Sequence, residues 1–282
     1  MVIQNLYQPF EIVYKEADTC PSAHQHNFFE LAYIMDGTGK QCINKNKFDY
    51  HKGHFFLLTP QDCHSFEIEA RTSFFFLRFH DVYLKSLREK DNYNWIQRLE
   101  FIFHNASHLP GCILKNNSDK LLVHSIVESL LREKENEAIF HNELVQQLVN
   151  TLLTIVARNI AGNVPDKLKK KGTDETALKM VSYLHQHIYN PDMLRAEQIC
   201  NTFGISLNYL SEYFKKHTGE TLQQYITNYK MRLVETRLQH SSMRISEIAY
   251  ELNFTDESHL NRMFKKHKGV NPSDYRKSVV AN

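Results

Sequence analysis

Short apolar runs, separated by polar turn residues, dominate the first 80 positions of the chain. The runs cover residues 28–35, 54–58 and 73–79, and the turns between them include Asp36-Gly37-Thr38-Gly39 and Pro60-Gln61-Asp62. Strand-length segments at a spacing of about 8–12 residues are typical of a small β-sandwich or β-barrel. We therefore predict a β-domain over residues 1–110.

The spacing of the apolar residues becomes helical after Pro110. Residues 121–131 and 144–156 carry apolar side chains three or four positions apart, with polar side chains between them. The second stripe, which includes Leu144, Leu148 and Leu152, is wide enough to cover a domain face and also to contact a second copy of the chain. Helix packing within the monomer is the alternative, and we favour a helical dimerisation segment over residues 111–162.

A polar and charged stretch then separates this segment from the rest of the chain. Residues 163–173 contain four lysines and one aspartate together with Pro165 and Gly172, a composition that predicts a linker. The pattern is helical throughout residues 174–282. Its first helical face carries five apolar residues, which are Ala177, Met180, Val181, Leu184 and Ile188.

The last hundred residues contain an internal repeat with a period of fifty. Residues 209–219 (YLSEYFKKHTG) return as residues 259–269 (HLNRMFKKHKG). Each copy follows a shorter helix and a turn that contains Gly204 or Asn253, the two residue types that most readily adopt a left-handed backbone. Two helices joined by such a turn form a helix-turn-helix, whose second helix enters the major groove of DNA.

A continuous helical pattern over residues 222–240 joins the two copies. At ~1.5 Å per residue it would span about 28 Å. Successive major grooves on one face of a duplex lie about 34 Å apart. One chain could therefore recognise two adjacent half-sites on double-stranded DNA.

Residues 173–278 resemble the DNA-binding domain of the AraC/XylS family of bacterial transcription regulators. The resemblance rests on Ile245-Ser-Glu-Ile-Ala249 and on the segment from Asn253-Phe254 through Phe264-Lys-Lys-His-Lys-Gly269 to Tyr275-Arg276. It implies base contacts in both copies, at Asn208, Ser211, Glu212, Glu257, Ser258, His259, Asn261 and Arg262. It also implies contacts to the DNA backbone, at Ser206, Lys215, Lys216, Lys265 and Lys266.

Three positions depart from the family pattern. Glu212 stands where arginine is common, Asn253 where glycine is usual, and Arg195 where a serine or threonine normally caps the helix. A missing cap removes a hydrogen bond worth ~1 kcal/mol. Arg262 is the strongest candidate for sequence recognition, because a bidentate arginine–guanine contact gives about 1–3 kcal/mol of discrimination.

Two motifs near the N-terminus resemble those of the cupins. They are His24-x-His26-x₃-Glu30-x₆-Gly37 and Gly53-x₆-Pro60-x₃-His64. In metal-binding cupins the matching residues hold a divalent metal, so the resemblance makes His24, His26, Glu30 and His64 candidate ligands. We interpret the four side chains first as the lining of a small-molecule effector pocket, with a metal site and purely structural histidines as alternatives; no cofactor is firmly implied.

The strand expected at residues 73–79 adds two polar side chains to this region. Arg78 and His80 alternate with Phe75, Leu77 and Phe79, and so they share the face of Phe74 and Phe76. Inside a barrel they would anchor a carboxylate or sugar hydroxyls of an effector. The alternative, which the sequence slightly favours, is that both point to solvent.

Charge and composition narrow the class of protein. The net charge is −3 over residues 1–163 and +5 over residues 164–282, which points to a polyanionic partner for the second half. No apolar run approaches the ~18 residues of a membrane span. The five cysteines form no C-x-x-C pair, and the N-terminus has no secretory pattern, so we expect a soluble, cytoplasmic protein.

The sequence thus predicts an α+β multidomain protein, with a cupin-like N-terminal β-barrel followed by two helices and an all-α tandem helix-turn-helix domain. We expect a homodimeric, effector-controlled transcription regulator and not an enzyme. The family resemblance implies that it activates transcription by contacting RNA polymerase. A cupin-type metal-dependent enzyme fused to a DNA-binding module is the alternative.

Overall fold

The computed structural model describes residues 3–19, 23–44, 46–60, 62–80, 83, 103, 111–136, 138–161 and 174–280. The chain forms two compact units, residues 1–164 and 165–282, and each is considered by itself. The predicted linker, residues 163–173, lies outside the described residues. Within the described residues, no helix is both long enough and apolar enough to cross a membrane.

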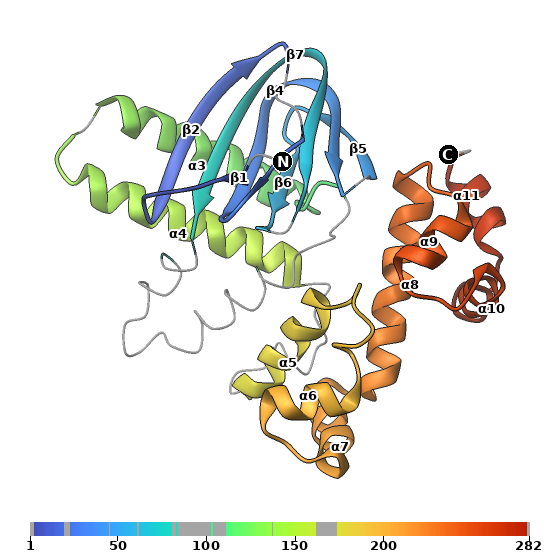
Figure 1. The fold of residues 1–282 in the computed structure, drawn as a ribbon. Helices are drawn as coiled ribbons and strands as arrows, with labels where there is room; N and C mark the ends of the chain where they lie inside the picture. Colours follow the sequence, from blue (N-terminus) through green and yellow to red (C-terminus); the bar gives the residue numbers. More distant parts are fainter. Residues whose placement is uncertain are drawn as a thin grey trace. The chain divides into compact units, whose positions relative to one another are not determined.

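The N-terminal unit is built on a five-stranded antiparallel sheet (Figure 1). Its strand order is β2-β7-β4-β5, and β6 pairs with the first part of β4. The strands are β2 (Phe10–Ala17), β4 (Phe29–Ile43), β5 (Asn46–His51), β6 (Phe55–Leu58) and β7 (His64–Phe79). A separate parallel pair consists of β1 (Ile3–Gln4) and β3 (Gln25–His26).

A bulge bends the central strand β4. The register against β7 shifts between Ile34 and Gly39, and Gly37 has a φ of 102°. A Cβ at Gly37 would lie 2.4 Å from Thr72 Oγ1, so both the backbone angle and the space require glycine. Before the bulge β4 pairs with β6, and after it β4 pairs with β5. The bend therefore lets one strand belong to two differently oriented parts of the sheet.

The two faces of the sheet carry separate apolar clusters, because side chains alternate along each strand. One face carries Ala32, Ile34, Phe74 and Phe76, which pack with aromatic residues of β5 and the first half of β7. The opposite face is covered by helices α3 (Asn117–Asn136) and α4 (His141–Ile160) (Figure 1). The helices and this face form one continuous core.

The apolar stripe of α4 is used mainly inside the monomer. Leu152 is fully buried in the core shared with the sheet, whereas Leu148 is half-buried and Leu144 is 45 % exposed. The interpretation of Leu152 as an interface residue therefore needs correction, because its side chain has no surface to offer a partner. The helices of the predicted dimerisation segment share one core with the sheet, and their role in dimerisation stays a prediction.

The C-terminal unit is helical and contains two helix-turn-helix motifs. Its helices are α5 (Glu175–Gln186), α6 (Ala196–Phe203), α7 (Leu207–Thr218), α8 (Leu222–His240), α9 (Ile245–Glu251), α10 (Glu257–Lys268) and α11 (Pro272–Val280). Helix α8 has the bounds that the sequence predicts. The predicted apolar face of α5 is buried, and Phe214 and Phe264 are fully buried core residues.

Candidate functional site

The strand register of the N-terminal unit places one arginine between two glutamates. Arg78 in β7 lies opposite Glu11 of β2 on one side and opposite Glu30 of β4 on the other. Arg78 Nε donates to Glu30 Oε2 at 2.8 Å, and Arg78 Nη1 donates to Glu11 Oε2 at 3.2 Å. The guanidinium also stacks on Phe28 and Phe76, whose ring centroids lie 5.7 and 5.6 Å away.

Arg78 and His80 are not solvent-facing groups. The side chain of Arg78 is 24 % exposed, and His80 is half-buried with its Nε2 donating to the carbonyl of Leu6 at 2.8 Å. The alternative in which both residues point to solvent is therefore wrong. The paired strands draw Arg78 inward because the carboxylates on each side offset the cost of removing its charge from water.

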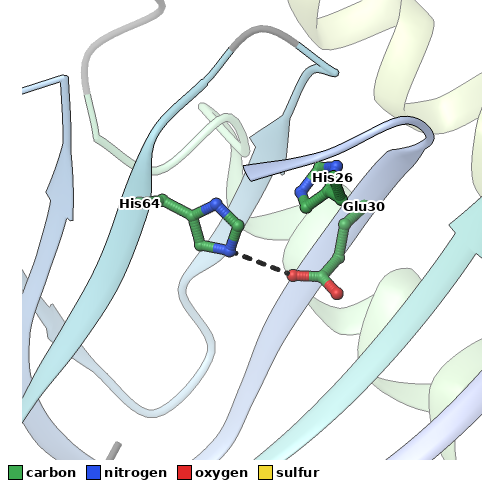
Figure 2. Close-up of side chains that lie close together, drawn as sticks. All are labelled: His26, Glu30 and His64. Carbon is green, nitrogen blue, oxygen red and sulfur yellow. Dashed lines mark ion pairs between the residues drawn. The ribbon is translucent and has the colours of Figure 1, made fainter. Parts of the chain in front are cut away.

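Next to this ion pair, His26, Glu30 and His64 converge from three strands (Figure 2). All three side chains are at most 3 % exposed. His64 Nε2 lies 3.6 Å from Glu30 Oε1. His26 Nδ1 donates to the carbonyl of Phe28 at 2.7 Å, which leaves a lone pair on Nε2, and that buried atom has no hydrogen-bond partner.

His24 joins the cluster through its backbone and its ring. The backbone amides and carbonyls of His24 and His64 pair at 3.1 and 3.0 Å, and their ring centroids lie 4.5 Å apart. The structure thus brings together five of the six residues predicted for the effector pocket. The sixth, His80, lies at the margin of the cluster, where its ring makes an edge contact with Phe28. Glu11 is an additional member that the sequence analysis missed.

Burial and charge act in opposite directions on the cluster. Burial alone would raise the pKa of Glu30, but the neighbouring His64 ring and the positive charge of Arg78 outweigh it and lower that pKa to about 2. Burial lowers the pKa of His26 to about 4, against the attraction of Glu30. At neutral pH the cluster therefore holds an ionised glutamate beside a neutral histidine.

The donor types in the cluster fit a divalent transition metal. His26, Glu30 and His64 each offer one ligand atom, and these three atoms lie within 4.8 Å of one another. Two imidazoles and one carboxylate are a common ligand set for such ions. The bond from His26 to Phe28 also supplies the outer hydrogen bond that a metal-bound histidine usually makes. His64 Nδ1, in contrast, is buried without a hydrogen-bond partner, and His24 is outside this group of donors.

The C-terminal unit presents two turns with the left-handed backbone that the sequence predicts. Gly204, between α6 and α7, has a φ of 64°, and Asn253, between α9 and α10, has a φ of 55°. Helix α10 begins with a side-chain cap, because Asp256 Oδ1 accepts from the amide of His259 at 2.7 Å. Neither Arg195 at the start of α6 nor Ser206 at the start of α7 makes such a bond.

The predicted DNA contacts lie where a duplex could reach them. Exposed positions on α7 and α10 include Asn208, Ser211, Glu212, Glu257, Ser258 and Arg262. His259 and Asn261 are partly exposed, and the predicted backbone contacts are all exposed: Ser206, Lys215, Lys216, Lys265 and Lys266. Their individual roles stay predictions.

Asp256 escaped the sequence analysis although its signal was present. An aspartate directly before a helical pattern is a common start signal, and here it follows the turn at Asn253 by three positions. Tyr189, Arg237 and Glu251 were also missed. No local pattern could have revealed these three, because they meet only after α8 and α9 have packed.

Two family profiles match the chain. An AraC-like ligand-binding domain matches residues 12–94, and a helix-turn-helix domain matches residues 199–278. Among curated relatives, the HTH-type transcriptional activator RhaR of Escherichia coli (strain K12) is 24 % identical over 258 residues, which cover 90 % of this chain and 86 % of RhaR. RhaR of Salmonella schwarzengrund (strain CVM19633) is 25 % identical over 253 residues, with the same coverage of 90 % and 86 %.

Solved structures give further similarities. ToxT from Vibrio cholerae (P21 form) is 14 % identical, covers 95 % of this chain and 98 % of its own, and superimposes with a TM-score of 0.37. The DNA-binding domain of AdpA in complex with a target DNA is 19 % identical, covers 38 % of this chain and 94 % of its own, and has a TM-score of 0.35.

Proposed function

Because this chain belongs to the AraC/XylS family of bacterial transcription regulators, we propose a division of labour between its two units. The chain is a DNA-binding regulator under the control of a small-molecule effector. In our proposal, α7 and α10 contact bases in adjacent major grooves, and the polar cluster around Glu30 and Arg78 holds the effector. We also propose that the protein acts in the cytoplasm as an activator that contacts RNA polymerase, since RhaR is named an activator.

One observation carries the DNA-binding part of the proposal. The two turns repeat the left-handed conformation at Gly204 and Asn253, and the unbroken helix α8 joins the two motifs. Each motif places a helix with an exposed polar face after its turn. Arg262 on α10 is the residue that we expect to contact guanine, and Glu212 on α7 is suited to accept from a cytosine amino group.

The effector site follows from the charges in the N-terminal unit. Arg78 holds two carboxylates at once, and Glu11 is the more exposed of the two, with 43 % of its side chain accessible. A carboxylate of an effector could take the place of Glu11 on Arg78 without leaving Glu30 unpaired. We propose that His24, His26, Glu30, His64 and His80 line the rest of this pocket.

Self-association is the third part of the proposal. Leu144 and Leu148 retain exposed surface on α4, and α3 adds Leu121 and Leu122, which are 71 % and 45 % exposed. Apolar side chains at such exposure favour contact with a second copy of the chain. An effector would then act by shifting the population of dimers whose DNA-binding units reach their half-sites together.

A metal-dependent role for the N-terminal unit is the second candidate, and the unpartnered Nε2 of His26 favours it. His26, His64 and Glu30 would hold the ion, which would supply a Lewis-acid centre for oxygen atoms of a bound small molecule. Elemental analysis of the purified chain decides this point. About one metal per chain, lost in Glu30→Gln, would support the metal role, and a metal-free protein with normal effector response would exclude it.

Selection from a random duplex library at ~0.15 M salt tests the DNA-binding proposal. We expect the full chain, or residues 165–282 alone if the effector-free protein is inactive, to enrich two short motifs about one helical turn apart. Enrichment of one motif would assign recognition to the second helix-turn-helix only. No enrichment by either protein would contradict the proposal.

A further inference from the structure

A buried arginine connects the long helix to the second helix-turn-helix. Arg237 of α8 is 1 % exposed. Its Nε donates to Glu251 Oε2 at 2.8 Å and its Nη2 donates to Glu251 Oε1 at 3.1 Å. Glu251 is the last residue of α9. This two-point contact fixes the end of α9 against α8, because a fork of two parallel bonds restricts both distance and angle.

Tyr189 brings the connection that precedes the first helix-turn-helix into the same contact. It follows α5 and precedes α6, and its hydroxyl accepts from Arg237 Nη2 at 3.3 Å. Its carbonyl accepts from Asn253 Nδ2 at 2.9 Å. Asn253 is the left-handed turn residue of the second helix-turn-helix. Tyr189, a single residue of the connection between α5 and α6, is therefore bonded both to α8 and to the turn that precedes α10.

The second helix-turn-helix is attached to α8 at further points. Glu235 of α8 pairs with Lys268 of α10 at 2.8 Å. Lys230 lies over the ring of Phe254, 5.6 Å from its centroid. These contacts make α8, α9 and α10 one rigid group. The first half of the unit packs on the other end of α8, where His185 of α5 bonds the hydroxyl of Tyr225 and stacks on Tyr229. The bonds at Tyr189 add a direct link from the connection between α5 and α6 to the second helix-turn-helix.

We propose that Tyr189, Arg237, Glu251 and Asn253 form a clamp that sets the orientation of α7 relative to α10 and so fixes the half-site spacing that the protein accepts. The inference rests on the proposed recognition of two half-sites by one chain. An inserted base pair turns one half-site by about 34° and moves it by about 3.4 Å. When several bonds hold the two helix-turn-helix motifs in one orientation before binding, DNA with the altered spacing cannot contact both motifs without breaking some of those bonds. The protein therefore discriminates against the altered spacing.

Two substitutions open the clamp without breaking the fold. Asn253→Gly keeps the left-handed turn, since glycine adopts a φ of 55° freely and Gly204 occupies the equivalent position, but it removes the bond to Tyr189. Tyr189→Phe removes only the hydroxyl. Arg237 is left intact, because its loss would leave the carboxylate of Glu251 without its partner. Tyr250→Phe on α9, a residue 87 % exposed, is the matched control.

The experiment measures affinity for duplexes that carry both selected half-sites at the selected spacing and with one base pair added or removed. We expect the unaltered chain and Tyr250→Phe to lose about tenfold or more at the altered spacings, and the Tyr189→Phe/Asn253→Gly double variant to lose less than about threefold. Affinity for a duplex with a single half-site should stay the same in all three proteins.

Two results would overturn the clamp. One is a double variant with the spacing profile of the unaltered chain, and the other is a double variant that loses single-site and double-site binding equally, which is the result of a purely structural role. Failure of the proposed function looks different, because the unaltered chain itself would then show no preference for two half-sites over one.

Discussion

At the scale of the residue, neighbouring strands decide which charges of the N-terminal unit meet. Arg78 has a carboxylate on each side only because β7 lies between β2 and β4 in one register. A register change by one residue would turn Arg78 to the other face of the sheet. Glu30 depends on this arrangement more than Glu11 does, since its side chain is 3 % exposed and that of Glu11 is 43 % exposed.

Removal of the charge of Arg78 should therefore be costly. We expect Arg78→Met to lower the free energy of unfolding by about 3–5 kcal/mol, because a buried carboxylate would lose its partner. The matched control is Arg71→Met, whose partner Glu16 lies at the surface. That variant should unfold almost like the unaltered chain in urea. Equal losses in both variants would contradict the role given to the buried pair.

The buried histidines predict how stability depends on pH. Burial lowers the pKa of His26 and of His54 from 6.5 to about 4, so an unfolded chain takes up protons between these values that the folded unit does not. Stability should fall as pH decreases from about 6.5 to about 4. Glu30, with its pKa lowered to about 2, adds a second loss between about pH 4.5 and 2.

Thermal unfolding midpoints measured along this pH range check the expectation. His26→Gln should reduce the fall between pH 6.5 and 4 and leave the later loss in place, because glutamine does not titrate. An unaltered fall in that variant would show that His26 does not titrate as its burial indicates.

Some residues of the site were predictable and others were not. The resemblance to the cupin motifs predicted that His26, Glu30 and His64 lie close together, and the structure brings them within reach of one another from three strands. The pairing of Arg78 with Glu11 depends on the register between strands, which no single strand encodes. The position of His24, outside the group of metal-donor atoms, depends on how its ring packs against His64.

At the scale of the element, helix α4 shows how a stripe of apolar residues divides between two uses. The same helical face carries residues that are fully buried against the sheet and residues that remain exposed. The sequence predicted the helix, because its period is local. It did not predict the division, because that depends on how closely α3 and the sheet approach α4.

Substitutions at two leucines of α4 distinguish the contribution of the helix to dimerisation from its contribution to the core. We expect Leu144→Glu to convert a dimer to a monomer in sedimentation analysis without lowering the thermal unfolding midpoint, because Leu144 is 45 % exposed. Leu152→Ala, in contrast, should cost about 2–5 kcal/mol of unfolding free energy by leaving a cavity in the core. A Leu144→Glu protein that remains a dimer would place the interface elsewhere.

At the scale of the whole molecule, the net charge of +5 over residues 164–282 favours a polyanionic partner for the half of the chain that the helix-turn-helix profile matches. That charge does not distinguish specific from general binding. Two residues of α10 would do so in our proposal, since Arg262 lies among the predicted base contacts and Lys265 among the predicted backbone contacts.

Two alanine substitutions in α10 should therefore have different effects. We expect Arg262→Ala to weaken binding to the selected site by about 1–3 kcal/mol and to leave binding to random DNA almost unchanged. Lys265→Ala should weaken binding to both kinds of DNA. It should also reduce the slope of log affinity against log salt concentration by about one, which corresponds to one counterion fewer released on binding. Equal losses on both kinds of DNA for Arg262→Ala would make it a backbone contact.

The core that the sheet shares with α3 and α4 cannot form until both helices have been synthesised. The face of Leu31 and Leu77 is complete when β7 ends at Phe79, but the second of the two helices that cover it ends at Ile160, about 80 residues later. At a synthesis rate of about 5–20 residues per second, that face waits about 4–16 s for its cover. During this interval the nascent chain exposes part of the apolar face that the helices later bury, so its yield in the cell should depend on chaperones and on the speed of translation.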